Sequence, residues 1–266
     1  PIYYDIDDLV FDTRYTDQLS YTKNLPIKEK ANYDAAVEQY GKLLRLCDGA
    51  ITTTSTLKNA LEKYNVPVLL NRNLANQDLV EISNKVTKKI SDKVKIGYFS
   101  GSITHNENFE LIKPALIRLL QEEKQVELHL VGHLDIPEDI RALKSQIVTH
   151  DYMDWHELPE VLGQMDINLA PLVTSVFNAA KSEIKWLEAA LVKVPTLASD
   201  IGAYQEMIRH DKTGVLVSDE KWFEALKELV VNKDKRIQIA EIAKNYVLEH
   251  CITLGHYDDL LNFLEK

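Results

Sequence analysis

The chain has only two cysteines in 266 residues, Cys47 and Cys251, and most of its length separates them. A disulfide framework needs more cysteines, and a zinc site needs them closely spaced, so we predict neither. No apolar run approaches the roughly 20 residues of a membrane-spanning helix, and no secretory signal is recognisable. We therefore expect a soluble, cytoplasmic protein with two free, packed thiols.

The chain also lacks an excess of positive charge, since 31 Lys and Arg stand against 41 Asp and Glu. Residues 1–95 hold 14 basic and 13 acidic side chains, whereas residues 96–266 hold 17 and 28. Binding to a nucleic-acid backbone normally shows as a basic stripe, so we expect no nucleic-acid partner. A single nucleotide needs only a few local donors and stays compatible with this composition.

Short apolar runs alternate with helical patterns along the whole chain, which predicts parallel sheets. We predict strands at 1–12, 49–54, 66–70, 94–100, 126–131, 146–149, 166–170 and 194–198. We predict helices at 28–47, 56–64, 76–93, 107–122, 137–144, 157–164, 182–191, 203–209, 222–231, 234–249 and 257–266. The series from residue 94 onward is typical of a doubly wound α/β domain, and a domain boundary is expected at about 90–94.

The predicted helix 182–191 is the most informative segment, because its two faces differ. Ser182 is suited to cap it, and Ile184, Leu187, Ala190 and Leu191 repeat at helical spacing and form an inner face. Lys181, Lys185 and Glu188 share the other side. Two ammonium groups near a helix start suit a diphosphate, and a carboxylate further along suits two ribose hydroxyls. The alternative is a surface helix whose charges are merely solvated.

Several segments, in this order, resemble bacterial retaining glycosyltransferases of the GT-B fold, close to family 4 (glycosyl transferases group 1). They are residues 5–12, 95–102 with His105, 130–132, 166–172, 177–199 and 202–208. The resemblance implies two Rossmann-like, doubly wound parallel-sheet domains that face each other across a cleft. It implies transfer of a sugar from a nucleotide-diphosphate donor, most simply UDP, to a polysaccharide, glycolipid or glycoprotein acceptor, without cofactor or metal.

The resemblance also divides the chain. Residues 1–90 correspond to a partial acceptor-side domain, residues 91–252 to the nucleotide-sugar-binding domain, and residues 253–266 to a helix that packs back on the first domain. Because Pro1 stands inside what reads as an internal strand, we expect an amino-terminal portion to be missing. The family pattern is compatible with peripheral contact with the inner face of the membrane.

The family's E-x7-E signature is only half present. Glu188 matches the second glutamate, which binds the donor ribose, but Ala180 stands where the first would contact the sugar. The loop after the strand 94–100 also lacks the usual Arg and Lys. We therefore assign catalysis to Lys181, Lys185 and Glu188, because two ammonium groups can stabilise a leaving diphosphate. Lys185 is assigned to catalysis alone. The expected donor site consists of nine residues: Gly101, Ser102, His105, Gly132, Asn178, Lys181, Ser182, Glu183 and Glu188.

Three carboxylates near the start of the chain, Asp5, Asp7 and Asp8, are assigned to the acceptor side. Two other readings stay open for them: a metal site of the Asp-x-Asp type used by GT-A glycosyltransferases, or local capping. Lys85, Lys88 and Lys89 suit either an anionic lipid surface or a solvated linker, and Trp155 suits either the base pocket or packing. At the level of function, the alternatives are a non-catalytic sugar-nucleotide-binding partner domain and a GT-B epimerase.

Overall fold

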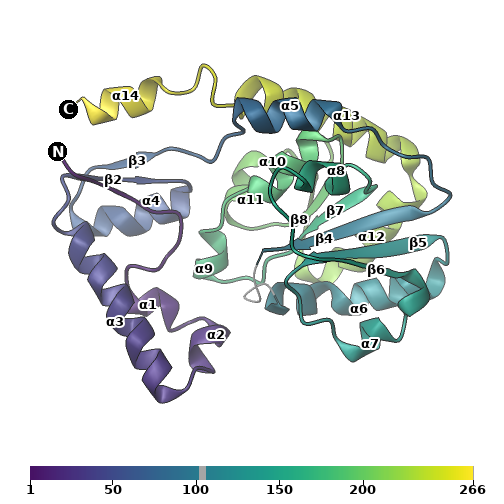
Figure 1. Ribbon diagram of the computed structural model, residues 1–266, viewed down its shortest axis with the longest axis horizontal. Coiled ribbons are helices and arrows are strands. Elements are labelled where there is room, and N and C mark those ends of the chain that lie inside the picture. The colour runs from purple at the N-terminus through teal and green to yellow at the C-terminus, as the bar shows by residue number, and fades with distance from the viewer. Residues whose placement is uncertain (102–105, 266) are drawn as a thin grey trace.

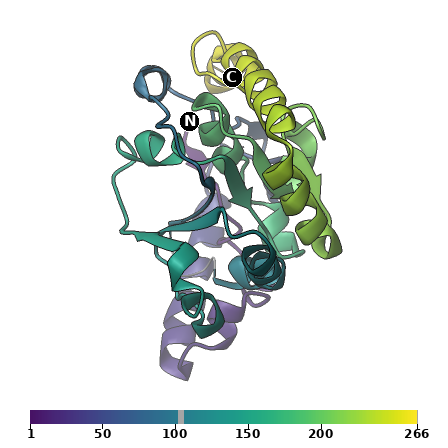
Figure 2. The ribbon, with the colours of Figure 1, turned by 90° about the vertical axis from the view of Figure 1, so that its right-hand side faces the viewer.

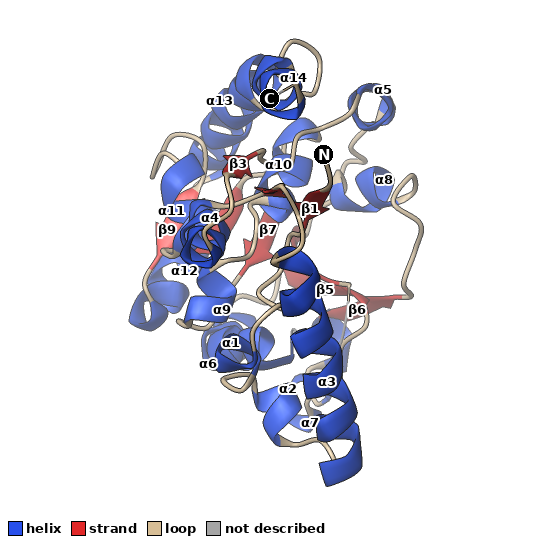
Figure 3. Cartoon of the chain, turned by 90° about the vertical axis from the view of Figure 1, so that its left-hand side faces the viewer, coloured by secondary structure: helices blue, strands red, loops and turns tan. Residues whose placement is uncertain are grey.

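The computed structural model describes residues 1–101 and 106–265, which form two α/β units side by side (Figure 1). The first unit has a parallel sheet in the order β1-β2-β3, formed by Tyr3–Asp5, Gly49–Thr52 and Val68–Leu70. Its helices are α1 (Thr13–Thr16), α2 (Ser20–Lys23), α3 (Ile27–Leu44) and α4 (Ser55–Leu61), followed by the 3-10 turn η1 (Glu62–Tyr64). In Figure 3, α3 runs down this unit with α1 and α2 beside its lower part.

The second unit has a six-stranded parallel sheet in the order β6-β5-β4-β7-β8-β9. Its strands are Ile147–His150, Val126–Gly132, Val94–Ser100, Ile167–Ala170, Thr196–Ser199 and Val215–Val217, in that spatial order. The register places Ser100 beside Gly132, and Tyr98 beside Leu169. The chain proceeds outward from β4 to β6 and then returns to β7 on the other side of β4. The topological switch point therefore lies between β4 and β7.

Helices cover both faces of this sheet, because its strands bury side chains in both directions. One face packs on α6 (Asn106–Glu122), α7 (Glu138–Arg141) and α12 (Trp222–Val231), around residues such as Ile96 and Leu128. The other face packs on α8 (Leu158–Leu162), α10 (Ile184–Leu191) and α13 (Lys233–His250). In Figure 2, α13 runs along one side of the unit in yellow-green. The short helices α9 (Val176–Ala179) and α11 (Gly202–Met207) lie on the side of the first unit.

The chain crosses between the units twice, and the two crossings touch. It leaves β3 toward α5 (Gln77–Lys85), which packs on α8 and α10 of the second unit, although the predicted boundary lies after this helix. It returns after α13 to α14 (Asp258–Leu264), where the Phe263 ring lies 5.4 Å from that of Tyr3. The Ala75 amide donates to the Cys251 carbonyl (2.8 Å), and the Thr253 amide donates to the Ala75 carbonyl (2.9 Å). Residues 71–75 and 251–257 thus form a hydrogen-bonded pair of connections.

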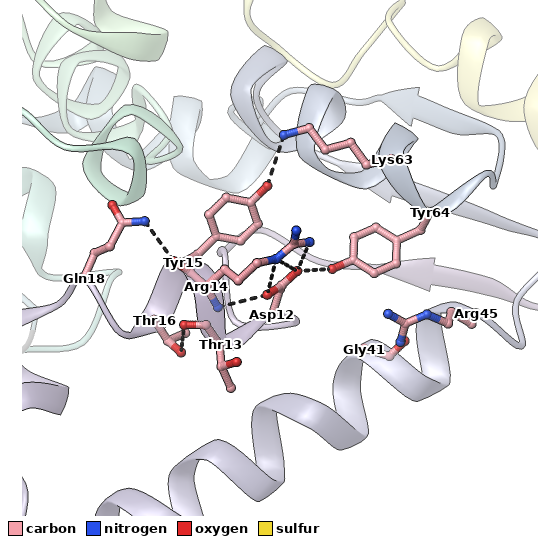
Figure 4. A network of polar contacts seen from close by, with 10 residues as sticks. All are labelled: Asp12, Thr13, Arg14, Tyr15, Thr16, Gln18, Gly41, Arg45, Lys63 and Tyr64. Carbon is pink, nitrogen blue, oxygen red and sulfur yellow. Dashed lines mark hydrogen bonds and ion pairs between the residues drawn. The ribbon is translucent and has the colours of Figure 1, made fainter.

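A polar network connects the loop after β1 to α3 and η1 in the first unit (Figure 4). The Asp12 carboxylate caps α1 by accepting from the Arg14 amide (2.9 Å), and it also accepts from the Arg14 guanidinium and the Tyr64 hydroxyl. The hydrogen bonds from Arg14 lower the pKa of Asp12 to about 2. The Arg45 guanidinium lies over the Tyr64 ring, 4.9 Å from its centroid. The network ties α1, the end of α3 and η1 together.

The long helix α3 agrees in position with the predicted helix 28–47. About half of each side chain of Tyr40 and Leu43 is exposed. The buried positions of α3 are Val37, Gly41 and Leu44. Leu44 packs with Leu9 and Phe11 of the segment that follows β1. A Cβ at Gly41 would lie 2.4 Å from the Phe11 carbonyl oxygen, so the backbones meet at this glycine.

Candidate functional site

The site lies where the chain reverses direction in the six-stranded sheet, at the carboxyl ends of β4 and β7, where open α/β sheets bind their ligands. Asn108, near the start of α6, is buried and connects the segment after β4 with the segment after β7. Its side-chain oxygen accepts from the Val173 amide (2.8 Å) and from the Asn178 side-chain amide (3.2 Å). Asn178 is therefore held at this edge. Gly101, directly after β4, is exposed, and a Cβ placed on it would have no heavy atom within 4 Å.

Helix α10 is fixed by polar contacts at both sides of its first turn. The Asn168 side chain on β7 donates to the Lys185 carbonyl (3.1 Å), and the Trp186 indole donates to the Thr213 carbonyl (2.6 Å). Trp186, Leu187 and Ala190 are buried, as the helical spacing predicts for the last two. The polar face that carries Lys185 and Glu188 is thereby held toward the switch point.

Lys185 and Glu188 are half-buried, lie three residues apart on α10 and are not within ion-pair distance of each other. Within residues 1–101 and 106–265, no carboxylate lies within 4 Å of the Lys185 ammonium, which sits 5.6 Å from the Tyr98 ring centroid. Burial lowers the pKa of Lys185 to about 8, although Glu188 opposes the shift. Burial likewise raises the pKa of Glu188 to about 7, against the effect of Lys185. Both groups are thus poorly solvated and available to a ligand.

Lys181 joins the donor side to the first unit. Its ammonium lies 2.7 Å from an Asp8 carboxylate oxygen and 4.9 Å from the Phe177 ring centroid. Asp8 belongs to the loop after β1, so the structure brings one of the three carboxylates predicted for the acceptor side onto one of the lysines predicted to act in catalysis. Asp5 and Asp7 are exposed. Among the described residues, no group of three or more His, Cys, Asp or Glu side chains is placed to hold a metal ion.

Ser182 and Glu183 hold the two units together instead of ordering the helix start. The expected Ser182 cap is wrong: the cap position is Glu183, which makes no side-chain capping bond, and the Ser182 hydroxyl accepts from Asn73 (2.9 Å). Glu183 is almost fully buried, and burial raises its pKa, while the Arg72 guanidinium 3.7 Å away opposes the shift. Arg72 also pairs with Glu206 on α11. Because Asn73 and Arg72 follow β3, these contacts cross between the units.

The position of the absent sugar-contacting glutamate is closed by packing. Ala180 is fully buried in a cluster with residues of the first unit such as Leu57. Its carbonyl accepts a hydrogen bond from the Thr54 hydroxyl (3.1 Å). Thr54, which caps α4, therefore reaches across to the loop before α10. A glutamate side chain at this position would have to displace the contact between the units.

Aromatic rings line the other end of the carboxyl edge, after β5 and β6. Gly132 has φ +86°, and a Cβ there would lie 2.2 Å from the Ser100 carbonyl oxygen, so this turn requires glycine. The next ring, His133, stacks on Tyr152 with centroids 5.0 Å apart, and Tyr152 is largely exposed. Trp155 is partly exposed and packs on His156. An exposed stacked pair beside a glycine turn suits a planar base.

Two expected donor residues, Ser102 and His105, lie outside the described part of the chain. Sequence reasoning did not single out Arg72, Tyr98, Tyr152 or Tyr204, which shape the site. Tyr98 and Tyr204 are fully buried phenols whose pKa values burial raises, and Tyr204 lies close enough to Glu183 and Glu188 to feel both charges. Arg72 was within reach of prediction, since it stands directly after a predicted strand.

Comparison with known families gives one match. Residues 94–232, just over half of the chain, match the family model described as Glycosyl transferases group 1. A search of curated proteins found no significantly similar sequence. No helix in the described ranges combines the length and the apolar character needed to cross a membrane.

Solved structures with the same architecture include three that show how the chain is arranged. A mutant of TarM from S. aureus, in complex with fondaparinux, alpha-GlcNAc-glycerol and UDP, has a TM-score of 0.68 at 14% identity over 86% of this chain. HepE (Alr3699) from Anabaena, in complex with UDP-glucose, has a TM-score of 0.70 at 13% identity over 100% of it. WaaG, a glycosyltransferase involved in lipopolysaccharide biosynthesis, has a TM-score of 0.69 at 16% identity over 98%.

The match covers different shares of these proteins: 47% of the TarM chain, 72% of HepE and 73% of WaaG. At these identities the likeness concerns the fold, and it agrees with the two parallel-sheet units and the switch point described above. The expected GT-B architecture is confirmed, with a small first unit of three strands. Together with the family match over the second unit, this places the chain in the glycosyl transferases group 1 family.

Proposed function

We propose that the protein is a retaining glycosyltransferase that transfers a sugar from a UDP-sugar to a glycan, lipid-linked or protein acceptor. The observation that carries the proposal is the line of Lys181, Lys185 and Glu188 at the carboxyl edge of the six-stranded sheet. Two of these groups are poorly solvated and, within residues 1–101 and 106–265, form no ion pair, and the third meets a carboxylate of the first unit. The choice of UDP draws support from TarM and HepE, whose structures contain UDP or UDP-glucose.

In this proposal the donor lies across the switch point. The ammonium groups of Lys181 and Lys185 neutralise the diphosphate, and the Glu188 carboxylate accepts hydrogen bonds from the ribose hydroxyls. Gly132 permits close approach of the backbone, and the His133–Tyr152 pair offers a face for the base. The remaining expected donor residues, Gly101, Ser102, His105, Asn178 and Glu183, surround this line in the proposal.

The chemistry follows from positioning and charge. The bond between the anomeric carbon and the β-phosphate oxygen breaks, and the acceptor hydroxyl forms the new bond on the same face of the sugar. The hydroxyl proton passes to the departing phosphate oxygen, so no separate protein base is required. Lys181 and Lys185 stabilise the negative charge that develops on the leaving diphosphate. In this proposal the acceptor enters beside Asp8, a placement supported by the 2.7 Å distance between Asp8 and Lys181.

Calorimetric titration with UDP, GDP and their common sugar derivatives tests the proposal. We expect one nucleotide to bind, and Lys181→Ala and Glu188→Ala each to weaken it by tenfold or more, which is about 1.4 kcal/mol. Lys212→Ala, at an exposed position of the same unit, is the control and should bind normally. If no nucleotide binds, or if both site variants bind as wild type does, the donor site is misplaced.

The alternative that merits the same experiment is a non-catalytic partner domain. The specific observation in its favour is that Ala180 and Lys181 are both engaged by the first unit, through Thr54 and Asp8. Nucleotide binding without any hydrolysis or transfer of the bound sugar would support this alternative.

A further inference from the structure

A cavity lies at the end of the six-stranded sheet opposite the switch point. Its volume is about 360 Å³, and it opens beneath the amino ends of the strands, next to Asp166 before β7 and Pro195 before β8. The connector 88–91 and the first two turns of α13 form its other walls. Neither the family signature nor the proposed chemistry involves any of these residues.

The cavity is basic, although the second unit as a whole is strongly acidic. Its lining includes five cationic side chains, Lys88, Lys89, Lys193, Lys233 and Arg236, and one carboxylate, Asp166. That carboxylate is already engaged, since one oxygen pairs with the Lys88 ammonium (2.8 Å) and the other accepts from the Lys95 amide (2.8 Å). Lys193 pairs with Glu241 outside the cavity. Within residues 1–101 and 106–265, Lys89 and Lys233 have no ion-pair partner, so positive charge is left over.

Arg236 gives this charge a fixed position. The residue is 8% exposed, and one of its terminal nitrogens donates to the carbonyls of Leu229 and Val230 at the end of α12. Burial lowers the pKa of the guanidinium. In the described part of the chain, its Nε and second terminal nitrogen have no hydrogen-bond partner. A buried, immobilised guanidinium with a free edge on a cavity matches the two oxygens of a phosphate group.

Apolar side chains stand at the rim of the same cavity. Ile90, in the connector, is fully exposed, and Ile237 on α13 is half exposed. Exposed isoleucines are costly in water, and two of them beside a basic cavity match the boundary between lipid headgroups and acyl chains.

We propose that this basic cavity binds a phosphate-type oxyanion, held by the free edge of Arg236 and by Lys89 and Lys233. A soluble phosphate ester and the headgroup of an anionic lipid present the same group, and the exposed Ile90 and Ile237 favour the lipid. The inference does not depend on the proposed transferase activity, because the cavity and the switch point lie at opposite ends of the strands.

The test compares two charge-reversal variants of equal net charge. Lys89→Glu/Lys233→Glu alters the cavity, whereas Lys212→Glu/Lys221→Glu alters two exposed lysines elsewhere on the same unit. Neither variant alters a residue of the proposed donor site, so any binding of the probe at that site is the same in the two variants. The probes are inorganic pyrophosphate, followed by the Arg236 Nε–H resonance, and phosphatidylcholine vesicles with or without phosphatidylglycerol, followed by sedimentation.

We expect pyrophosphate to shift the Arg236 resonance in wild type and in the control variant, but not in the cavity variant. We expect binding to phosphatidylglycerol vesicles to fall by tenfold or more in the cavity variant alone, since each basic group near such a surface contributes about 1 kcal/mol. A pyrophosphate response without vesicle binding supports the oxyanion site and assigns it to a soluble phosphate ester. The proposal is overturned if neither probe is bound, or if the two variants lose binding equally.

Discussion

Glu188→Gln is expected to stabilise the unliganded protein while it removes donor binding. Burial raises the pKa of Glu188 from 4.5 to about 7, a difference of 2.5 units. At 1.36 kcal/mol per unit, the ionised carboxylate costs the fold about 3 kcal/mol at pH above 7. Glutamine has nearly the same shape without the charge, so this cost disappears. The raised pKa already includes the attraction to Lys185, and we expect a net stabilisation of about 1–3 kcal/mol at pH 8.

The sign of the pH dependence is also fixed by this shift. Because the folded pKa lies above the unfolded one, the folded protein binds the proton more tightly. The contribution of Glu188 to stability is therefore fully present below about pH 4.5 and is lost as pH rises through 7. Wild type and Glu188→Gln should differ little at about pH 5 and most at about pH 8.

Denaturant unfolding at both pH values measures this difference, with intrinsic fluorescence as the probe. All three tryptophans, at positions 155, 186 and 222, belong to the second unit, so the signal reports the domain that contains Glu188. Glu241→Gln, which alters an exposed pair with Lys193, is the control and should change stability by less than about 0.5 kcal/mol. A destabilised Glu188→Gln, or an equal effect at both pH values, would refute the reasoning.

Three further predictions concern the contacts around the site. Asp8→Asn should tighten nucleotide binding by up to about fivefold in calorimetry, because the Asp8 carboxylate no longer competes with the nucleotide for Lys181. This ion pair is partly exposed and is worth at most about 1 kcal/mol. Weaker binding would contradict this. Asp12→Asn should destabilise the first unit by about 2 kcal/mol near neutral pH, measured as faster amide exchange in α1 and α3. The difference in stability from wild type should disappear as pH falls through the Asp12 pKa of about 2. A difference that does not depend on pH would count against this reasoning. Gly202→Ala should cost about 2 kcal/mol in denaturant unfolding, since φ is +56° and the new Cβ would lie 2.3 Å from the Ala179 carbonyl oxygen, whereas Gly101→Ala should cost little.

The sequence was sufficient for the architecture because periodicity and turn residues are local signals. Strands β4 to β8 and helices such as α6, α10 and α12 lie within a few residues of their predicted positions. The strand predicted at 1–12 is shorter in the structure and covers only Tyr3–Asp5. The residues after it form the loop that contains Asp8 and Asp12. Strand β9 was not predicted, since three residues are too few to show alternation.

The site was less accessible to sequence reasoning, because its decisive contacts join distant segments. The lysine–aspartate pair of residues 181 and 8, and the contact of Ser182 with Asn73, depend on how the two units meet. Capping propensity favoured Ser182 as the first residue of the helix, but its hydroxyl found a partner in the other unit. The perturbed pKa values of Lys185 and Glu188 likewise come from burial that only the packed structure supplies.

The paired connections at residues 71–75 and 251–257 constrain how the molecule moves. A single flexible linker would let the first unit twist and translate freely over the second. Two connections that are hydrogen-bonded to each other at Ala75 resist twisting of one unit against the other. The two connections therefore hold the facing edges of the units in register, where Asp8 meets Lys181 and Arg72 meets Glu183. Alignment of the two units comes from the backbone, and the side chains between them add attraction.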